Sequence, residues 1–112
     1  MRNINCRREM LWMGKDLVIC IQNEDGHIGS VVTAQPYKKQ DKVHVTLSAW
    51  NQLSHKDDMV ASLYAKQAAL CLQQIVTCVC GIHIDDICEE ELQAILTWVH
   101  QDVEKMKQEV KQ

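Results

Sequence analysis

The sequence predicts a single α+β domain with a strand-rich front and a helical back. Two β-prone runs, residues 4–12 and 16–22, are separated by a short turn around Gly14. A helical period of three and four residues takes over after Leu53 and dominates the C-terminal third. A chain of 112 residues has room for one modest core. We therefore expect one domain over residues 1–112.

The front of the chain is expected to form an antiparallel meander of three strands followed by a fourth. A turn signal at residues 23–26 leads from the second run into a third strand, residues 27–35. The second run is apolar on both faces, so it should be the central strand. Pro36 lacks a donor for the ladder and is expected to end the third strand. A fourth strand over residues 43–48 has one wet face, on which His44 should be exposed.

The back is expected to contain a helix, a buried strand and a long C-terminal helix. The first helix covers about residues 55–73, and the strand is the apolar run 75–80. The apolar face of this first helix should consist of Met59, Val60, Leu63, Leu70 and Cys71. The last helix, about residues 88–110, is longer than a domain of this size requires. Its distal half is therefore expected to pack on another subunit, which predicts a homodimer through this helix or an adjoining sheet face.

Charge and composition exclude several classes of partner. A net charge of -3 gives no general attraction to nucleic acid or to an anionic membrane. The longest apolar run is about a third of the length that spans a bilayer, and no hydrophobic signal region follows Met1. The six cysteines contain no C-x-x-C pair, so they are expected to be reduced thiols, mostly in the core. These observations predict a soluble, cytoplasmic protein.

Three histidines, His27, His55 and His83, lie where one regular element should stop and another start. Such junctions hold polar side chains on a rigid frame and leave them open to solvent, which is typical of binding sites. Beside His27, Gly29 allows close approach of a ligand and Ser30 supplies a small hydroxyl. An exposed histidine beside turn glycines explains the same residues without a ligand.

The other two histidines have polar neighbours with chemistry of their own. His55 and Lys56 are expected at a helix start, where free amides and the helix dipole attract phosphate. Asp57 and Asp58 compete for those amides, so ordinary capping is the alternative. His83 and Asp85 lie two residues apart, so in an extended segment they point to the same side and can hydrogen-bond. A divalent metal held by the three histidines and a carboxylate is a further possibility.

Three segments together resemble one small family of bacterial and archaeal proteins. They are Gly26-His27-Ile28-Gly29-Ser30-Val31-Val32-Thr33-Ala34, then His55-Lys56-Asp57-Asp58 at a helix start, then Val79-Cys80-Gly81-Ile82-His83-Ile84-Asp85. This chain is similar to the prenylated-flavin chaperone-like family, the small D subunit of gallate decarboxylase. The resemblance runs from about residue 15 to residue 100, with the three segments in order.

The resemblance implies a fold similar to that of proteasome assembly chaperones, a homodimer, and association with a UbiD-type decarboxylase that uses prenylated FMN. It implies no catalytic residues. We therefore expect a noncatalytic accessory protein whose site for prenylated FMN or FMN is formed by His27, Gly29, Ser30, His55, Lys56, His83 and Asp85. Trp50 and Tyr37 are candidates for stacking on the flavin ring. The alternatives are a small metal- or histidine-dependent enzyme and a purely structural homodimer.

Overall fold

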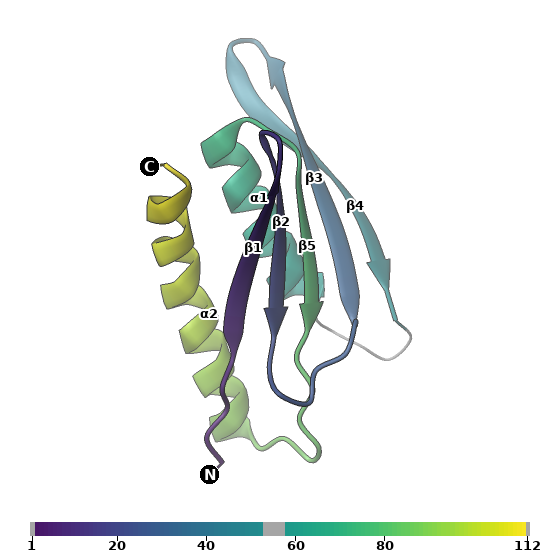
Figure 1. The fold of residues 1–112 in the computed structure, drawn as a ribbon, viewed down its shortest axis with the longest axis vertical. Helices are drawn as coiled ribbons and strands as arrows, with labels where there is room; N and C mark the ends of the chain where they lie inside the picture. The colour runs from purple at the N-terminus through teal and green to yellow at the C-terminus, as the bar shows by residue number, and fades with distance from the viewer. Residues whose placement is uncertain (1, 53–57, 112) are drawn as a thin grey trace.

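The computed structural model describes residues 2–52 and 58–111, and within them five strands form one sheet with two helices (Figure 1). The strands are β1 (Arg7–Met13), β2 (Asp16–Gln22), β3 (Ser30–Lys39), β4 (Lys42–Asn51) and β5 (Val76–Gly81), and the helices are α1 (Asp58–Leu72) and α2 (Glu89–Val110). The α+β class predicted from the sequence is confirmed, and the elements match the predicted ones to within a few residues.

The order of strands in the sheet is β1-β2-β5-β3-β4, so the predicted three-strand meander is wrong. β1 and β2 form one antiparallel hairpin, and β3 and β4 form another. Between them lies β5, parallel to β2 and antiparallel to β3. The turn signal at residues 23–26 therefore begins a connection past the end of β5. β2 is an inner strand, as its two apolar faces predict.

β3 continues through Pro36, against the expectation that this residue ends it. β5 pairs with β3 only as far as Ala34, whereas β4 still pairs with β3 at Pro36, opposite Val45. A missing N–H is tolerated here because the ladder on the β5 side has already ended. The hairpin then turns at Gln40 and Asp41, both with positive φ, as in two-residue type I′ turns.

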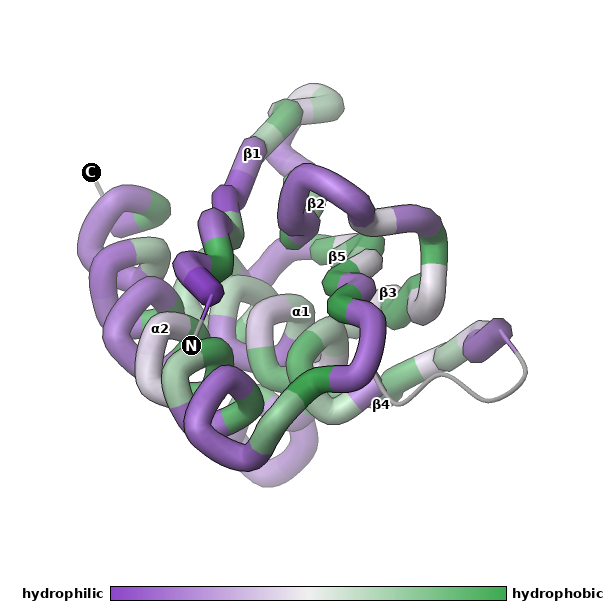
Figure 2. Tube along the Cα trace, turned by 90° about the horizontal axis from the view of Figure 1, so that it is seen from below, coloured by the Kyte–Doolittle hydropathy of each residue, from purple (hydrophilic) through white to green (hydrophobic). Residues whose placement is uncertain are grey.

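The core lies between the two helices and one face of the sheet (Figure 2). Alternate residues of the three inner strands point into it, and these are Leu17, Ile19, Ile21, Val32, Ala34, Val76, Cys78 and Cys80. The face of α1 that packs on the sheet consists mainly of small residues, Ala61, Ala65, Ala68 and Ala69, with Tyr64. The predicted apolar face of α1 is confirmed in part: Val60, Leu63 and Cys71 are partly buried against the core, whereas Met59 is 80% exposed. Alanine lets the helix lie close to the strands, which a larger side chain prevents.

The apolar stripe of α2 is buried within this chain, which corrects the expectation that its distal half packs on another subunit. Val99, Val103, Met106 and Val110 are all buried without a second copy. They are covered because α2 packs beside α1 on the same side of the sheet (Figure 2). The length of α2 therefore gives no reason for a dimer.

A largely buried ionic network joins β1, α1 and α2. The Tyr64 hydroxyl donates to Asp102 Oδ2 at 2.7 Å, and Arg8 Nε donates to the same oxygen at 2.8 Å. Arg8 Nη1 also donates to Glu109 at 2.6 Å. These bonds satisfy Asp102, which would otherwise be a buried unpaired charge. They fix α2 to the rest of the fold.

The second face of the sheet, called the open face below, is covered by neither α1 nor α2 (Figure 2). The strand register places two rows of side chains across it. One row is Leu11, Val18, Thr77, Thr33 and Ser48, and the other is Glu9, Cys20, Val79, Val31 and Trp50. Half-buried and exposed apolar side chains therefore lie at its centre.

Candidate functional site

The connections that carry His27 and His83 meet at one edge of the sheet, called the loop edge below. The parallel strands β2 and β5 both end there, and residues 23–29 and 82–88 follow them. The end of β4 reaches the same place, because Gln52 N donates to Gly29 O at 2.8 Å. In open sheets, ligands commonly bind outside the carboxyl ends of parallel strands. The loop edge is the candidate functional site.

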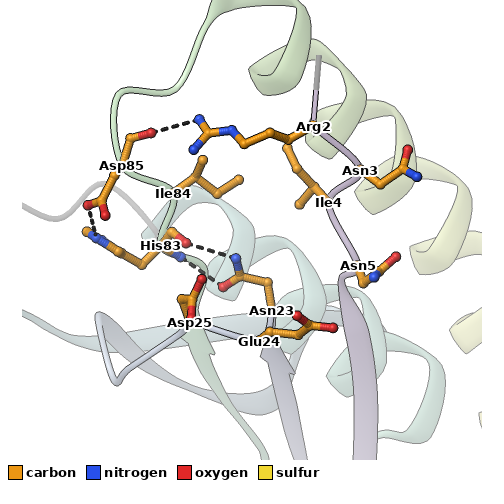
Figure 3. A pocket seen from close by; sticks show the side chains of 10 residues that line it. All are labelled: Arg2, Asn3, Ile4, Asn5, Asn23, Glu24, Asp25, His83, Ile84 and Asp85. Atoms are coloured by element: carbon orange, nitrogen blue, oxygen red, sulfur yellow. Dashed lines mark hydrogen bonds and ion pairs between the residues drawn. The ribbon is translucent and has the colours of Figure 1, made fainter.

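The structure brings His27, His83 and Asp85 together at this edge. The two imidazole rings have their centroids 5.2 Å apart and are tilted by 44°. Asp85 Oδ1 lies 2.9 Å from His83 Nε2, so the hydrogen bond expected from their spacing is confirmed (Figure 3). This bond orients the imidazole of His83 toward Asp85.

Two glycines allow the main chain of residues 26–28 to cross the end of β5 in close contact. A Cβ on Gly81 would overlap the carbonyl oxygen of His27, and a Cβ on Gly26 would overlap that of Gly81. Gly29 belongs to the same crossing, where its N–H donates to Cys80 O at 3.0 Å. The glycines therefore place His27 over the sheet, and the amide of Gly29 is used within the fold.

Ser30, one of the predicted site residues, is not brought to the surface of the loop edge. Ser30 is buried on the helix side, where its hydroxyl donates to Asn51 Oδ1 at 2.7 Å. His55 and Lys56 lie outside the described residues. Trp50 is exposed near this edge, whereas Tyr37 stacks on His44 close to the opposite end of the β3–β4 hairpin.

Asn23 holds the segment that carries His83, a role that sequence reasoning missed. Its Nδ2 donates to His83 O at 2.8 Å, and its Oδ1 accepts from His83 N at 3.0 Å (Figure 3). Asn23 is 7% exposed, so both bonds form away from bulk water. A signal existed in the sequence, because an asparagine directly after a buried strand is suited to bonding a neighbouring main chain.

A polar hollow of about 130 Å³ opens beside His83 (Figure 3). Amide side chains of Asn3, Asn5 and Asn23 line it, together with the carboxylates of Glu24 and Asp25. Amides and carboxylates accept hydrogen bonds from hydroxyl or amino groups, but the carboxylates repel a phosphate. The Arg2 guanidinium also lines it, so this hollow suits a neutral polyol.

The N-terminal segment closes one side of this hollow through Arg2. Arg2 Nη2 donates to Asp85 O at 2.7 Å (Figure 3). Arg2 Nε donates to Glu91 Oε2 at 2.9 Å. The Arg2 guanidinium, helped by the Cys88 N–H, holds the pKa of Glu91 well below its usual range. Glu91 thereby fixes both the N-terminal segment and the start of α2.

A second hollow, of about 240 Å³, lies on the open face at the loop edge and is called the sheet-face hollow below. Its floor contains Cys20 and Val79, which are neighbours on β2 and β5, and its wall is formed by His27 and Ile28. Burial raises the pKa of the Cys20 thiol, and Glu9 acts in the same direction. The thiol is therefore neutral, and the floor is largely apolar.

Two further findings concern metal binding and membrane-spanning helices in the part of the chain that the structure describes. Within residues 2–52 and 58–111, no group of three or more His, Cys, Asp or Glu side chains is placed to hold a metal ion. In the same residues, no helix is long and apolar enough to cross a membrane.

The fold defines the class of protein. A chain from a yeast 20S proteasome assembly chaperone complex superposes with a TM-score of 0.57 at 8% identity, over 97% of this chain and 98% of that one. The protein thus has a proteasome-assembly-chaperone-like fold. Residues 2–111 match the model of the prenylated flavin chaperone LpdD-like domain, and the chain belongs to this family. Curated proteins gave no match.

Proposed function

We propose that this chain is a noncatalytic accessory protein that binds prenylated FMN and delivers it to a UbiD-type decarboxylase, or stabilises that enzyme. The observation that carries the proposal is the family match, which extends over residues 2–111. The geometry of the loop edge supports it, because His27 and His83 from two distant segments lie side by side next to two hollows. A carrier needs such an open site, from which a ligand can leave.

The cofactor-binding residues in this proposal are those of the loop edge. His27, His83 and Asp85 supply hydrogen-bonding groups, and Gly29 shapes the crossing that holds His27. Ser30 supports the end of β4 through Asn51. Beyond these, His55 and Lys56 remain predicted contacts for the phosphate.

A second copy of the chain is the other proposed partner. With the stripe of α2 buried, the part of the open face away from the loop edge, where Leu11 and Met13 are 66% and 69% exposed, is the surface that supports a homodimer, since an exposed apolar patch commonly marks an interface. Light scattering should give about twice the 12.9 kDa of one chain at micromolar concentration. A mass of one chain would remove the homodimer. We place the protein in the cytoplasm, because a reducing compartment keeps its six cysteines as free thiols.

Cofactor transfer tests the proposed function. The protein is loaded with prenylated FMN, freed of excess ligand, and mixed with a UbiD-type decarboxylase prepared without cofactor. We expect decarboxylase activity to appear faster than with the same amount of free prenylated FMN. His27→Ala and His83→Ala should slow the transfer of the cofactor. His100→Ala, which removes an exposed side chain on α2, should not.

Three results would count against the proposal. They are failure of the wild type to retain prenylated FMN, absence of any effect on the decarboxylase, and equal behaviour of the His27, His83 and His100 variants. A small histidine-dependent enzyme is the alternative, supported by the His83–Asp85 pair beside His27. Turnover of a substrate by the purified protein alone would favour that alternative.

A further inference from the structure

We infer that the sheet-face hollow is the seat of the flavin ring system, with the ring lying flat on the open face against β2 and β5. This inference rests on the proposed function and adds the position of the ring to it. It assigns a binding role to Cys20, Val79 and Ile28, none of which the sequence indicated as a site residue. The polar hollow beside His83 is left to the hydroxyl groups of the ligand.

The floor of the sheet-face hollow has the shape and polarity that a fused ring requires. Cys20 on β2 and Val79 on β5 line the hollow, and Val31 on β3 continues the same row of the open face beside it. Three adjacent strands span two strand spacings, about 9.6 Å, which is comparable to the long axis of a three-ring system. All three side chains are half-buried and carry no charge. Prenylation adds further hydrocarbon to the flavin, and this floor can cover it.

Two side chains in the wall of the hollow can contact the edge of the flavin ring. The main chain of residues 26–28 lies over Gly81, so the His27 and Ile28 side chains border the hollow at the end of β5. Ile28 is 58% exposed, which is a large apolar side chain to leave in water unless something covers it. An imidazole and an aliphatic group together suit a ring that has both polar and apolar edges.

The two hollows differ in polarity more than in charge, and the sheet-face hollow has the less polar lining. The polar hollow carries the carboxylates of Glu24 and Asp25. On the open face, Arg7 is in register with Gln22, which lies beside Gly81 at the end of the hollow. The Arg7 guanidinium is half exposed and pairs with Glu9 at 3.3 Å, an exposed pair of small energy. It can therefore turn toward a phosphate, although Glu9 competes for it.

Two matched variants test the position of the ring with FMN as the probe. Val79→Asn places an amide on the floor of the hollow, whereas Val18→Asn makes the same change in the neighbouring row of the same face. The Kd for FMN is measured by quenching of flavin fluorescence, with melting curves for both variants. We expect Val79→Asn to weaken binding by about tenfold or more, because it buries an amide under an apolar ring. Val18→Asn should change the Kd by less than about threefold.

The possible outcomes separate this inference from the proposed function. If the wild type binds FMN and both variants bind equally well, or lose affinity equally, the ring does not lie in the hollow. Equal losses would instead indicate that the open face acts as a whole, as in an interface between two copies. If the wild type binds neither FMN nor prenylated FMN, the proposed function fails together with the inference.

A direct measurement remains decisive if Val79→Asn does not fold. In the wild-type protein, the aromatic protons of bound FMN should give nuclear Overhauser effects to the methyl groups of Val79, Val31 and Ile28. Contacts to residues of the polar hollow instead, such as Ile4 or Ile84, would overturn the assignment. Ile28 is an exposed residue in the wall of the sheet-face hollow. Ile28→Asn should therefore weaken FMN binding without lowering the melting temperature.

Discussion

Removal of one hydroxyl group should destabilise the protein measurably, because it belongs to the network that holds α2. In Tyr64→Phe the ring keeps its place in the core, and the bond from the hydroxyl to Asp102 at 2.7 Å is lost. Asp102 keeps its bonds from Arg8. A buried hydrogen bond to a charged acceptor contributes about 1.5–3 kcal/mol. For a domain of this size the melting temperature should fall by about 6–12 °C.

Asp102→Ala should cost more than Tyr64→Phe, because it leaves two buried groups without their acceptor. The Arg8 side chain is 9% exposed and would retain only Glu109 among its carboxylate partners in the described chain. Breaking a buried ion pair costs about 3–5 kcal/mol. The double variant should lose less than the sum of the two single changes, because both remove the same bond.

Urea unfolding at pH 7, followed by circular dichroism, measures these free energies. Lys107→Ala is the matched control: it removes a side chain that lies 3.5 Å from the exposed Glu104 on the same helix. It should cost less than about 1 kcal/mol. If Tyr64→Phe stays within about 0.5 kcal/mol of the wild type, the network does not hold α2 in the way inferred here.

Three further predictions concern the loop edge, the start of α2 and the proposed phosphate contact. Gly81→Ala should displace the segment that carries His27 and weaken FMN binding, whereas Gly14→Asn, in a distant turn with positive φ, should not; equal affinities would contradict the crowding at Gly81. Because the pKa of Glu91 is lowered in the folded state, its contribution to stability is present above about pH 4.5 and is lost as the pH falls below that value. Glu91→Gln should flatten the acid side of the melting-temperature profile and Glu90→Gln should not, and parallel profiles would refute this. Lys56→Ala should weaken FMN binding about tenfold while leaving the melting temperature unchanged, and an unchanged Kd would exclude Lys56 as the phosphate contact.

The sequence predicted the regular elements well because their signals are local. Alternation marks the strands, and the spacing of Val99, Val103 and Met106 marks α2. The position of β5 between β2 and β3 carries no such signal, because pairing of strands distant in sequence depends on how the whole sheet packs. The turn residues at 23–26 suit a hairpin equally well, so the meander was the natural but incorrect interpretation.

Burial in the helices was harder to predict from hydrophobicity alone. The buried face of α1 is rich in alanine, which contributes little to a hydrophobic pattern, so the exposed Met59 was assigned to it and the alanines were not. In α2 the signal was available: Asp102 falls on the apolar stripe between Val99 and Met106. A carboxylate at such a position requires a buried partner, and Arg8 and Tyr64 provide it.

The candidate site was predicted in part. Placing histidines at the ends of elements was enough to predict that His27 and His83 lie close together, because parallel strands end at a common edge. Ser30 was assigned to the surface, although its alternation with Val32 and Ala34 places it on the buried side of β3. The place of Asn23 directly after β2 was a signal for a main-chain contact, but its partner His83 depends on where β5 enters the sheet and could not be named before the topology was known.

Titration of the purified protein with prenylated FMN, followed by absorbance and by calorimetry, tests the central claim most directly. We predict saturable binding of one cofactor per chain, weakened about tenfold or more by His27→Ala and unchanged by His44→Ala, which alters an exposed histidine near the far end of the β3–β4 hairpin. Absence of saturable binding, or equal affinity of the wild type and the His27 variant, would contradict the assignment of the loop edge as the prenylated-flavin site.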